Sequence, residues 1–198
     1  ELVLSLERMN KALDFNAVDR TLTVQAGMPL EAVHNAAREH GLEYPVDFAA
    51  RGSCSIGGNI ANGSPIGEMP PLLIALGATV RLRSTEGTRE VAVEDYFIDY
   101  GKQDRRPGEF VETVIIPRKG GALIAAYKMS KRQSADISAI SAGFRIAVEN
   151  GIIASARVAF GGMAGIPARA VQAEAALEGR PFTAATFEAA ACAVKNDF

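Results

Sequence analysis

The sequence contains only two cysteines, Cys54 and Cys192, and they lie far apart. Two cysteines are too few for a four-cysteine zinc or iron–sulfur site, so no such metal centre is expected. The wide spacing also argues against a disulfide framework and is typical of a reducing cytosol, which predicts a cytoplasmic protein. Histidine is equally scarce: His34 and His40 fall on one predicted amphipathic helix without a partner cluster, and we expect them at its surface.

The sequence also lacks an excess of either charge and a long apolar run. The 21 Lys and Arg residues are balanced by 23 Asp and Glu residues, which leaves a formal net charge of −2. Such a balance gives no basic patch of the kind that attracts nucleic acids or anionic membranes. No apolar run approaches the roughly 18 residues of a membrane span, and Glu1–Leu6 lacks the basic region of a signal peptide. We expect an ordinary globular protein whose first residues form a strand inside a larger architecture.

Glycine, in contrast, is concentrated in one stretch, Gly52–Gly67, which holds five glycines in 16 residues. Glycine lacks the Cβ atom that would keep a ligand away from the backbone. Exposed N–H groups in such a turn can donate to phosphate, carbonyl or imide acceptors. The composition predicts a ligand-binding loop, although an isolated Gly-Gly pair would be read more simply as a tight structural turn.

The hydrophobic pattern divides the chain into two parts with a boundary at Pro117–Gly121. The first part is expected to contain strands at 2–6, 21–26, 79–83, 89–93 and 110–116, and helices at 29–40 and 71–76. The second part is expected to contain strands at 123–129, 140–149 and 153–160, then helices at 168–177 and from Thr183 onward. Polar turns are expected at 16–20 and 102–108. Helices gathered after an antiparallel sheet are typical of the α+β fold class.

Two groups of motifs resemble known flavoproteins. The segments Leu4–Asn10, Val24–Gly27 and Arg51–Ile60 resemble the FAD-binding PCMH-type domain, and residues 1–60 are most similar to FAD-linked 2-hydroxy-acid dehydrogenases of the glycolate/D-lactate type. From Gly58 onward, five segments resemble the small, flavin-carrying subunit of bacterial xanthine dehydrogenase and the CO dehydrogenase flavoprotein family: Gly58–Gly67, Tyr100–Phe110, Tyr127–Arg132, Asp136–Ser138 and Ala159–Ala164. The two resemblances meet near Ile56–Asn62, and a chimera joined there would explain both.

The resemblance implies two domains. Residues 1–118 correspond to an FAD-binding PCMH-type domain that lacks its N-terminal pyrophosphate-binding subdomain. Residues 122–198 correspond to a CO dehydrogenase flavoprotein C-terminal-like domain, a three-stranded antiparallel sheet plus helices, expected to be truncated. The 2Fe-2S domain of the xanthine dehydrogenase small subunit has no counterpart among these residues. Glu68 stands where the family usually has aspartate, so the carboxylate reaches one methylene further.

The resemblance also implies which residues hold FAD. The expected cofactor-binding residues are Ser55, Ile56, Gly57, Gly58, Asn59, Asn62, Glu68, Val111, Lys128 and Asp47. The glycines would allow close backbone approach, and a cation at Lys128 would stabilise the anionic reduced flavin.

Several of these residues also have purely structural readings. Lys128 could merely extend along the surface with its charge in water. Val111 could be an ordinary core residue, and Asp47 could lie in a connector. No catalytic residue and no metal ligand is assigned.

Charged residues outside this set have a structural and a functional reading. Lys131 and Arg132 are read as a solvated turn or as a positive rim for NAD or a partner. Asp104, Arg105 and Arg106 are read as an exposed loop or as a contact surface for a molybdenum subunit. Cys54 is read as a small buried side chain.

The function implied is that of an FAD-binding electron-transfer module in a xanthine dehydrogenase-like molybdenum hydroxylase. Electrons from purine oxidation in a separate molybdenum-binding subunit would pass through FAD to NAD+. Two alternatives stay open: a fragment of an FAD-linked 2-hydroxy-acid dehydrogenase, which the residues after Gly58 disfavour, or a folded recombined fragment without independent activity.

Overall fold

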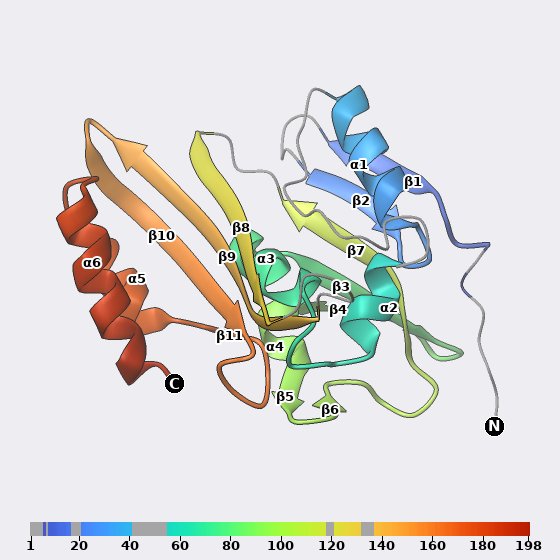
Figure 1. Ribbon diagram of the computed structural model, residues 1–198. Helices are drawn as coiled ribbons and strands as arrows, with labels where there is room; N and C mark the ends of the chain where they lie inside the picture. The colour runs from blue at the N-terminus through green and yellow to red at the C-terminus, as the bar shows by residue number, and fades with distance from the viewer. Residues whose placement is uncertain (1–5, 7, 17–20, 41–54, 118–120, 132–136) are drawn as a thin grey trace.

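The computed structural model of the chain describes residues 6, 8–16, 21–40, 55–117, 121–131 and 137–198 (Figure 1). Two antiparallel sheets dominate it. The first sheet has the strand order β1-β2-β7-β3-β4, and the second has the order β11-β10-β9-β8. A short two-stranded ribbon, β5-β6, lies beside the first sheet. The expected α+β fold class is confirmed.

The first sheet is built from segments distant in the sequence. Its strands are β1 (Ala12–Asn16), β2 (Thr21–Gln25), β7 (Phe110–Pro117), β3 (Thr79–Ser84) and β4 (Gly87–Ala92). β7 lies at the centre, where alternate residues such as Val114 pair with β2 on one side and β3 on the other. Val114 is fully buried, because a central strand covered by helices has its core-facing residues removed from water. Helix α1 (Leu30–Glu39) packs on this sheet through Leu30 and Val33.

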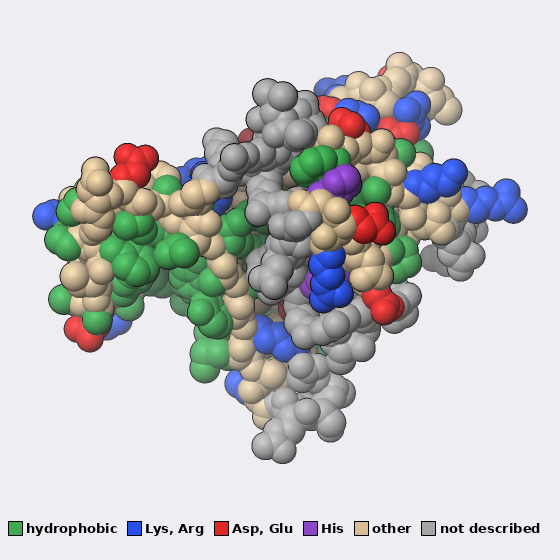
Figure 2. Space-filling view, turned by 90° about the horizontal axis from the view of Figure 1, so that it is seen from above, with side chains coloured by type: hydrophobic (Ala, Val, Ile, Leu, Met, Phe, Trp, Pro, Cys, Tyr) green, Lys and Arg blue, Asp and Glu red, His purple; other side chains and the backbone are tan. Residues whose placement is uncertain are grey.

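The second sheet is an antiparallel meander, in which strands consecutive in the sequence are neighbours, and helices follow it in the chain. Its strands are β8 (Ala122–Ser130), β9 (Ser138–Glu149), β10 (Ile152–Gly161) and β11 (Ala168–Arg169). The Asn150-Gly151 pair joins β9 to β10 with positive φ at both residues, 51° and 79°, as a tight hairpin requires. Helix α5 (Val171–Leu177) packs on β10, and α6 (Ala184–Ala193) and the 3-10 helix η1 (Val194–Asn196) pack on α5; Figure 1 shows α5 and α6 beside β10. Apolar side chains gather over the second sheet and its helices, at the left of Figure 2.

The expected elements agree with the structure in the main and differ at several places. β1 is not among the expected strands, although Leu13 and Phe15 alternate with Asp14 and Asn16 as in a strand. Residues 168–169 form β11, so the helix expected to begin at Ala168 begins at Val171. Residues 93–99 form the short helix α4 (Val93–Tyr96) followed by β5 (Phe97–Asp99), and β6 (Lys102–Gln103) lies in the predicted polar loop. The expected strand at 2–6 and the expected turn at 16–20 lie outside the described residues, except for Leu6 and for Asn16, which ends β1.

Helix α3 (Met69–Leu76) lies between the two sheets and is buried on every side. Its sequence is apolar throughout, which is typical of a helix without a solvent face. Two prolines, Pro70 and Pro71, stand in its first turn, where their missing N–H groups are not needed. Gly77 ends the helix with φ at 72°, a conformation that glycine adopts without strain.

The second sheet contacts α3 through glycine. A Cβ atom at Gly143 in β9 would lie 2.5 Å from Leu72 Cα and 2.6 Å from Pro71 O. Both are backbone atoms of α3, so a side chain could fit only if the helix moved away. The bare backbone of β9 therefore sets the distance between α3 and the second sheet.

None of the helices within the described ranges is both long and apolar enough to cross a membrane.

Replacing Gly143 by alanine is expected to lower the free energy of unfolding by about 1–3 kcal/mol, the range for overpacked cores. Alanine is intrinsically better than glycine in a strand, so any loss reports the contact with α3. Thermal unfolding should show a Tm lower by roughly 2–10 °C for a chain of this size.

Gly165→Ala is the matched control, because its Cβ would have Tyr100 Cβ as its nearest neighbour at 3.6 Å. It should leave Tm within about 2 °C of the wild-type value. Equal melting of the two variants would contradict the proposed tight contact.

Candidate functional site

The glycine-rich stretch is a helix over part of its length, which corrects the expectation of a loop. Residues Ile56–Ala61 form α2, and Ser55 caps it by accepting a hydrogen bond from the Gly58 N–H at 3.1 Å. Ile56 and Ile60, one turn apart, are both buried and anchor the helix to the core. The anchored isoleucines and the serine cap outweigh the low helix propensity of the glycine pair. Residues 52–54 lie outside the described part of the chain.

The two adjacent glycines of α2 face opposite surroundings. Gly57 faces the first sheet: its N–H donates to Ala26 O at 2.8 Å, and a Cβ there would lie 2.3 Å from Ala26 Cβ. Gly58 faces outward and is exposed, and an added Cβ would meet only the capping Ser55 Oγ within 4 Å. Asn62 follows one turn later and is also exposed. α2 therefore presents a flat backbone surface beside an amide side chain.

Asn59 connects α2 to the start of α3. Its Oδ1 atom accepts a hydrogen bond from the Met69 N–H at 3.3 Å, one of the donors that a helix leaves free at its first turn. Gly67 lies against the same side chain, since a Cβ there would come within 3.3 Å of Asn59 Oδ1. The Gly67 carbonyl in turn accepts from Ser141 Oγ of β9 at 3.3 Å. One asparagine thus fixes the geometry between two helices.

Glu68, Lys128 and Ser138 form a polar cluster beside this junction. The Lys128 ammonium lies 3.0 Å from Glu68 Oε1, and the Ser138 hydroxyl donates to the same oxygen at 2.6 Å. The side chains of Lys128 and Glu68 are 24% and 18% exposed, so the pair is partly shielded from water. The cluster joins the residue before α3 to β8 and to the start of β9.

The structure brings together seven of the ten expected cofactor residues: Ser55, Gly57, Gly58, Asn59, Asn62, Glu68 and Lys128. They lie on α2, at the start of α3 and on the strand next to it. Whether they touch a cofactor stays a prediction.

Of the other three expected residues, two have buried side chains and one is not described. Ile56 and Val111 are 1% and 2% exposed and belong to the hydrophobic core, so their side chains contact protein. Asp47 lies outside the described residues, as do Arg132 and Cys54. Lys131 is described and exposed.

Ser138 and Ser141 were not expected as site residues. Both are buried, at 2% and 3% exposure, and both bond to the segment that leads into α3. Buried serines need hydrogen-bond partners, but their spacing in a strand does not identify the partner. The only signal in the sequence was the segment Asp136–Ser138, which carried the family resemblance without a role for Ser138.

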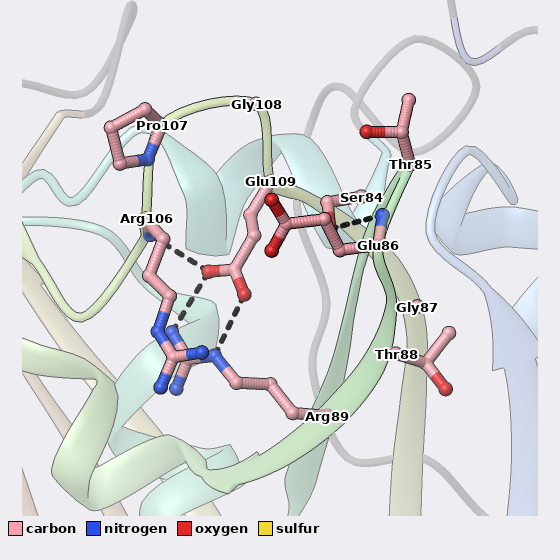
Figure 3. Close-up of a pocket in the computed structure, with 10 residues that line it drawn as sticks. All are labelled: Ser84, Thr85, Glu86, Gly87, Thr88, Arg89, Arg106, Pro107, Gly108 and Glu109. Carbon is pink, nitrogen blue, oxygen red and sulfur yellow. Dashed lines mark hydrogen bonds and ion pairs between the residues drawn. The ribbon is translucent and has the colours of Figure 1, made fainter.

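A separate cavity of about 280 Å³ lies at the tip of the β3–β4 hairpin, away from this cluster (Figure 3). It is lined by Ser84, Thr85, Glu86, Gly87, Thr88, Arg89, Arg106, Pro107, Gly108 and Glu109. None of the expected cofactor residues lines it. Its side chains are mostly those of two surface turns.

An arginine-centred network holds one wall of this cavity. Arg89 donates through Nε and Nη2 to the two carboxylate oxygens of Glu109, both at 2.8 Å, and through Nη1 to Asp104 at 2.8 Å. Figure 3 shows the Glu109 carboxylate between this guanidinium and the Arg106 backbone, whose N–H donates to it at 2.7 Å. Asp104 therefore has a structural partner inside the chain, and Arg105 and Arg106 are exposed, so the contact surface for a molybdenum subunit at 104–106 stays a prediction.

The hydrogen bond from Arg89, with that from the Arg106 N–H, lowers the pKa of Glu109 from 4.5 to about 2. Bidentate, charge-assisted bonds favour the ionised carboxylate in this way. The same partners raise the pKa of Arg89, although burial opposes the shift. The hydrogen bonds of Arg89 and Glu109 account for the structure of this cavity wall without a bound ligand. Within the described residues, no group of His, Cys, Asp and Glu is placed to hold a metal ion.

Comparison with known protein families gives two matches. A family model described as the FAD binding domain in molybdopterin dehydrogenase matches residues 1–119, and one described as the CO dehydrogenase flavoprotein C-terminal domain matches residues 125–198.

Individual proteins are similar over different lengths. The chain is 32% identical over 167 residues, 82% of its length, to xanthine dehydrogenase from Emericella nidulans. It is 93% identical over 61 residues, 31% of its length, to D-2-hydroxyglutarate dehydrogenase from Xanthomonas citri pv. viticola. The chain spans only 12% and 13% of these two proteins. CO dehydrogenase from Oligotropha carboxidovorans matches in structure with a TM-score of 0.79 and 26% identity, over 93% of this chain and 66% of that one.

The ionised form of Glu109 is expected to stabilise the fold at neutral pH. Because its pKa is lower in the folded chain than the ordinary 4.5, this contribution is present above pH 4.5 and is lost as the pH falls from 4.5 towards 2. Urea unfolding of Glu109→Gln should show a smaller loss of stability across this window than the wild type.

Glu86→Gln, on the same cavity but exposed, serves as the control and should follow the wild-type pH dependence. A Glu109→Gln variant with an unchanged acid slope would contradict the ion-pair assignment.

Proposed function

The chain belongs to the family of FAD binding domains in molybdopterin dehydrogenases, and we propose that it binds FAD across α2, the start of α3 and β8. The family match and the CO dehydrogenase flavoprotein C-terminal match behind it support a flavin module of a xanthine dehydrogenase-like or CO dehydrogenase-like molybdenum hydroxylase. One observation carries the location: Asn59 and Glu68 bring most of the expected cofactor residues into one place.

The residues at this junction fit a large, flat, partly anionic cofactor. The backbone of Gly58 is exposed, and a Cβ there would lie 2.7 Å from the capping Ser55 Oγ, so glycine keeps the cap intact and lets a planar group approach closely. Asn62 offers an amide donor and acceptor on the same side of α2. The Lys128 ammonium offers a cation in a partly shielded position.

Each residue has a distinct task in this proposal. Ser55 holds the first turn of α2, and Gly57 lets the helix lie directly on Ala26, so the Gly58 backbone is fixed before any ligand arrives. Glu68 and Ser138 hold Lys128 in place, and the ammonium stabilises negative charge that develops on a neighbouring group. Bound FAD supplies the redox chemistry, accepting electrons and passing them on. The chain contributes position and electrostatics.

The wider assembly is part of the same proposal. We place the division between the two domains at residues 118–122, with the FAD-binding PCMH-type domain before it. A molybdenum-containing partner subunit would oxidise the substrate, with a purine as substrate and NAD+ as final acceptor by analogy with the xanthine dehydrogenase relative. A cytoplasmic location stays a prediction. The chain covers a small share of that relative, so the substrate and acceptor depend on parts outside it.

A second candidate is favoured by a specific observation. The identity of 93% over 61 residues to a D-2-hydroxyglutarate dehydrogenase is far higher than the identity to the xanthine dehydrogenase relative. A chain with two such different relationships fits a recombined fragment, which would fold but bind FAD weakly, or a fragment of a 2-hydroxy-acid dehydrogenase. Binding of FAD at the α2–α3 junction separates the first proposal from an inert fragment.

The purified chain is expected to bind FAD and to show bound-flavin absorbance after removal of free cofactor. In a fluorescence titration, Lys128→Gln should weaken FAD binding by about tenfold, or ~1.4 kcal/mol, because a charged partner is lost. Lys195→Gln, an exposed lysine at the C-terminal end, is the matched control and should bind FAD as the wild type does.

A colourless chain that is folded by circular dichroism and takes up no FAD would contradict the proposed function. Equal affinity in the two lysine variants would contradict only the placement at Lys128.

A further inference from the structure

Two arginines lie side by side on the face of the second sheet that packs against α3. Arg145 in β9 is directly opposite Arg157 in β10. Both are two residues along their strands from the pair Gly143 and Ala159, and residues two apart in a strand share a face. The Arg157 side chain lies near the C-terminal end of α3, because its Nη2 atom donates to Ile74 O at 2.9 Å. The arginine pair therefore lies at the C-terminal end of the buried helix.

The carboxylates around this pair already have partners. Glu94 Oε2 accepts from Arg157 at 3.0 Å and from Arg169 at 3.3 Å. Glu174 pairs with Arg169 at 2.6 Å and also accepts the Val158 N–H at 2.8 Å. Two carboxylates thus serve two guanidinium groups, and nothing in this network reaches Arg145.

Arg145 is left without an acceptor among the described residues. Its Nε atom is buried and has no hydrogen-bond partner, while the side chain as a whole is partly exposed. Burial and the neighbouring charge of Arg157 lower the pKa of Arg145. Like charges directly opposite each other destabilise a sheet, and an unsatisfied buried donor adds to the cost.

The C-terminal end of α3 gives Arg157 a hydrogen-bond acceptor but gives none to Arg145. A cation near the last carbonyls of a helix is stabilising, and Arg157 reaches one of them. Arg145 makes no such bond. Glu94 and Glu174 pair with Arg157 and Arg169, so the guanidinium group of Arg145 has no carboxylate to balance its charge among the described residues.

We propose that Arg145, with Arg157 beside it, forms a binding site for an oxyanion, either a carboxylate or a phosphate group. The guanidinium fork matches paired anionic oxygens of both kinds, and an anion would supply the missing charge between the two arginines. The site lies at the opposite end of α3 from Glu68 and Lys128, about 12 Å away for a helix of eight residues. It is independent of the proposed FAD site.

The test compares thermal unfolding of the 198-residue chain in inorganic phosphate, in acetate and in chloride at equal ionic strength. At an oxyanion concentration about ten times Kd, Tm of the wild type should rise by about 3–5 °C relative to chloride. Arg145→Met keeps the apolar stem of the side chain and should abolish this rise. The arm that raises Tm identifies whether phosphate or carboxylate is the better ligand.

Arg180→Met is the matched control, because it removes the same charge from an exposed position on the same half of the molecule and should keep the rise. Isothermal titration calorimetry with the effective anion should show heat for the wild type and Arg180→Met but not for Arg145→Met. The inference is overturned if neither anion raises Tm above chloride, or if Arg145→Met responds as the wild type does. A rise that survives in Arg145→Met belongs to another site.

Discussion

The close contact between α3 and the bare backbone of β9 is the constraint on which the rest of the structure depends. α3 has no solvent face, so both sheets must cover it, and only a glycine at position 143 lets the second sheet come near enough. A similar approach occurs two residues from Ala159, the partner of Gly143, where a Cβ at Gly161 would lie 3.1 Å from Pro71 Cγ of α3. Packing at this density leaves no room for a methylene group, so the distance between the sheets is fixed rather than adjustable.

This fixed distance places different chemistry at the two ends of α3. At its start, Lys128 from the second sheet meets Glu68, and Asn59 ties the helix to α2. At its end, Arg157 bonds to Ile74 O, and Arg145 is left beside it. The glycine contact therefore does more than stabilise the core. It fixes the position of the second sheet against α3. As a result, residues about 60 positions apart in the sequence, such as Glu68 and Lys128, form one polar cluster at the proposed flavin site.

The sequence predicted the elements better than it predicted their contacts. The hydrophobic pattern of β7 to β10 and the glycine that caps α3 are local signals, and they suffice to predict these strands and the end of that helix. The glycine content of residues 52–67 predicts a loop, but the Ser55 cap and the burial of Ile56 and Ile60 make Ile56–Ala61 a helix. The resemblance identified Glu68 and Lys128, but their mutual ion pair and the role of Ser138 depend on tertiary packing. The structure also shows that Val111 in β7 and Ile56 in α2 are core residues, because burial depends on tertiary packing that the local sequence does not decide.

Hydrogen–deuterium exchange with and without FAD tests the central claim most directly, namely that the cofactor lies across α2, the start of α3 and β8. The account predicts that added FAD slows exchange in peptides covering Ile56–Ala61, Met69–Leu76 and Ala122–Ser130. Peptides covering the hairpin cavity at residues 84–89 should exchange at the same rate in both states. Protection confined to that hairpin, or no protection in a folded chain at saturating FAD, would contradict the account.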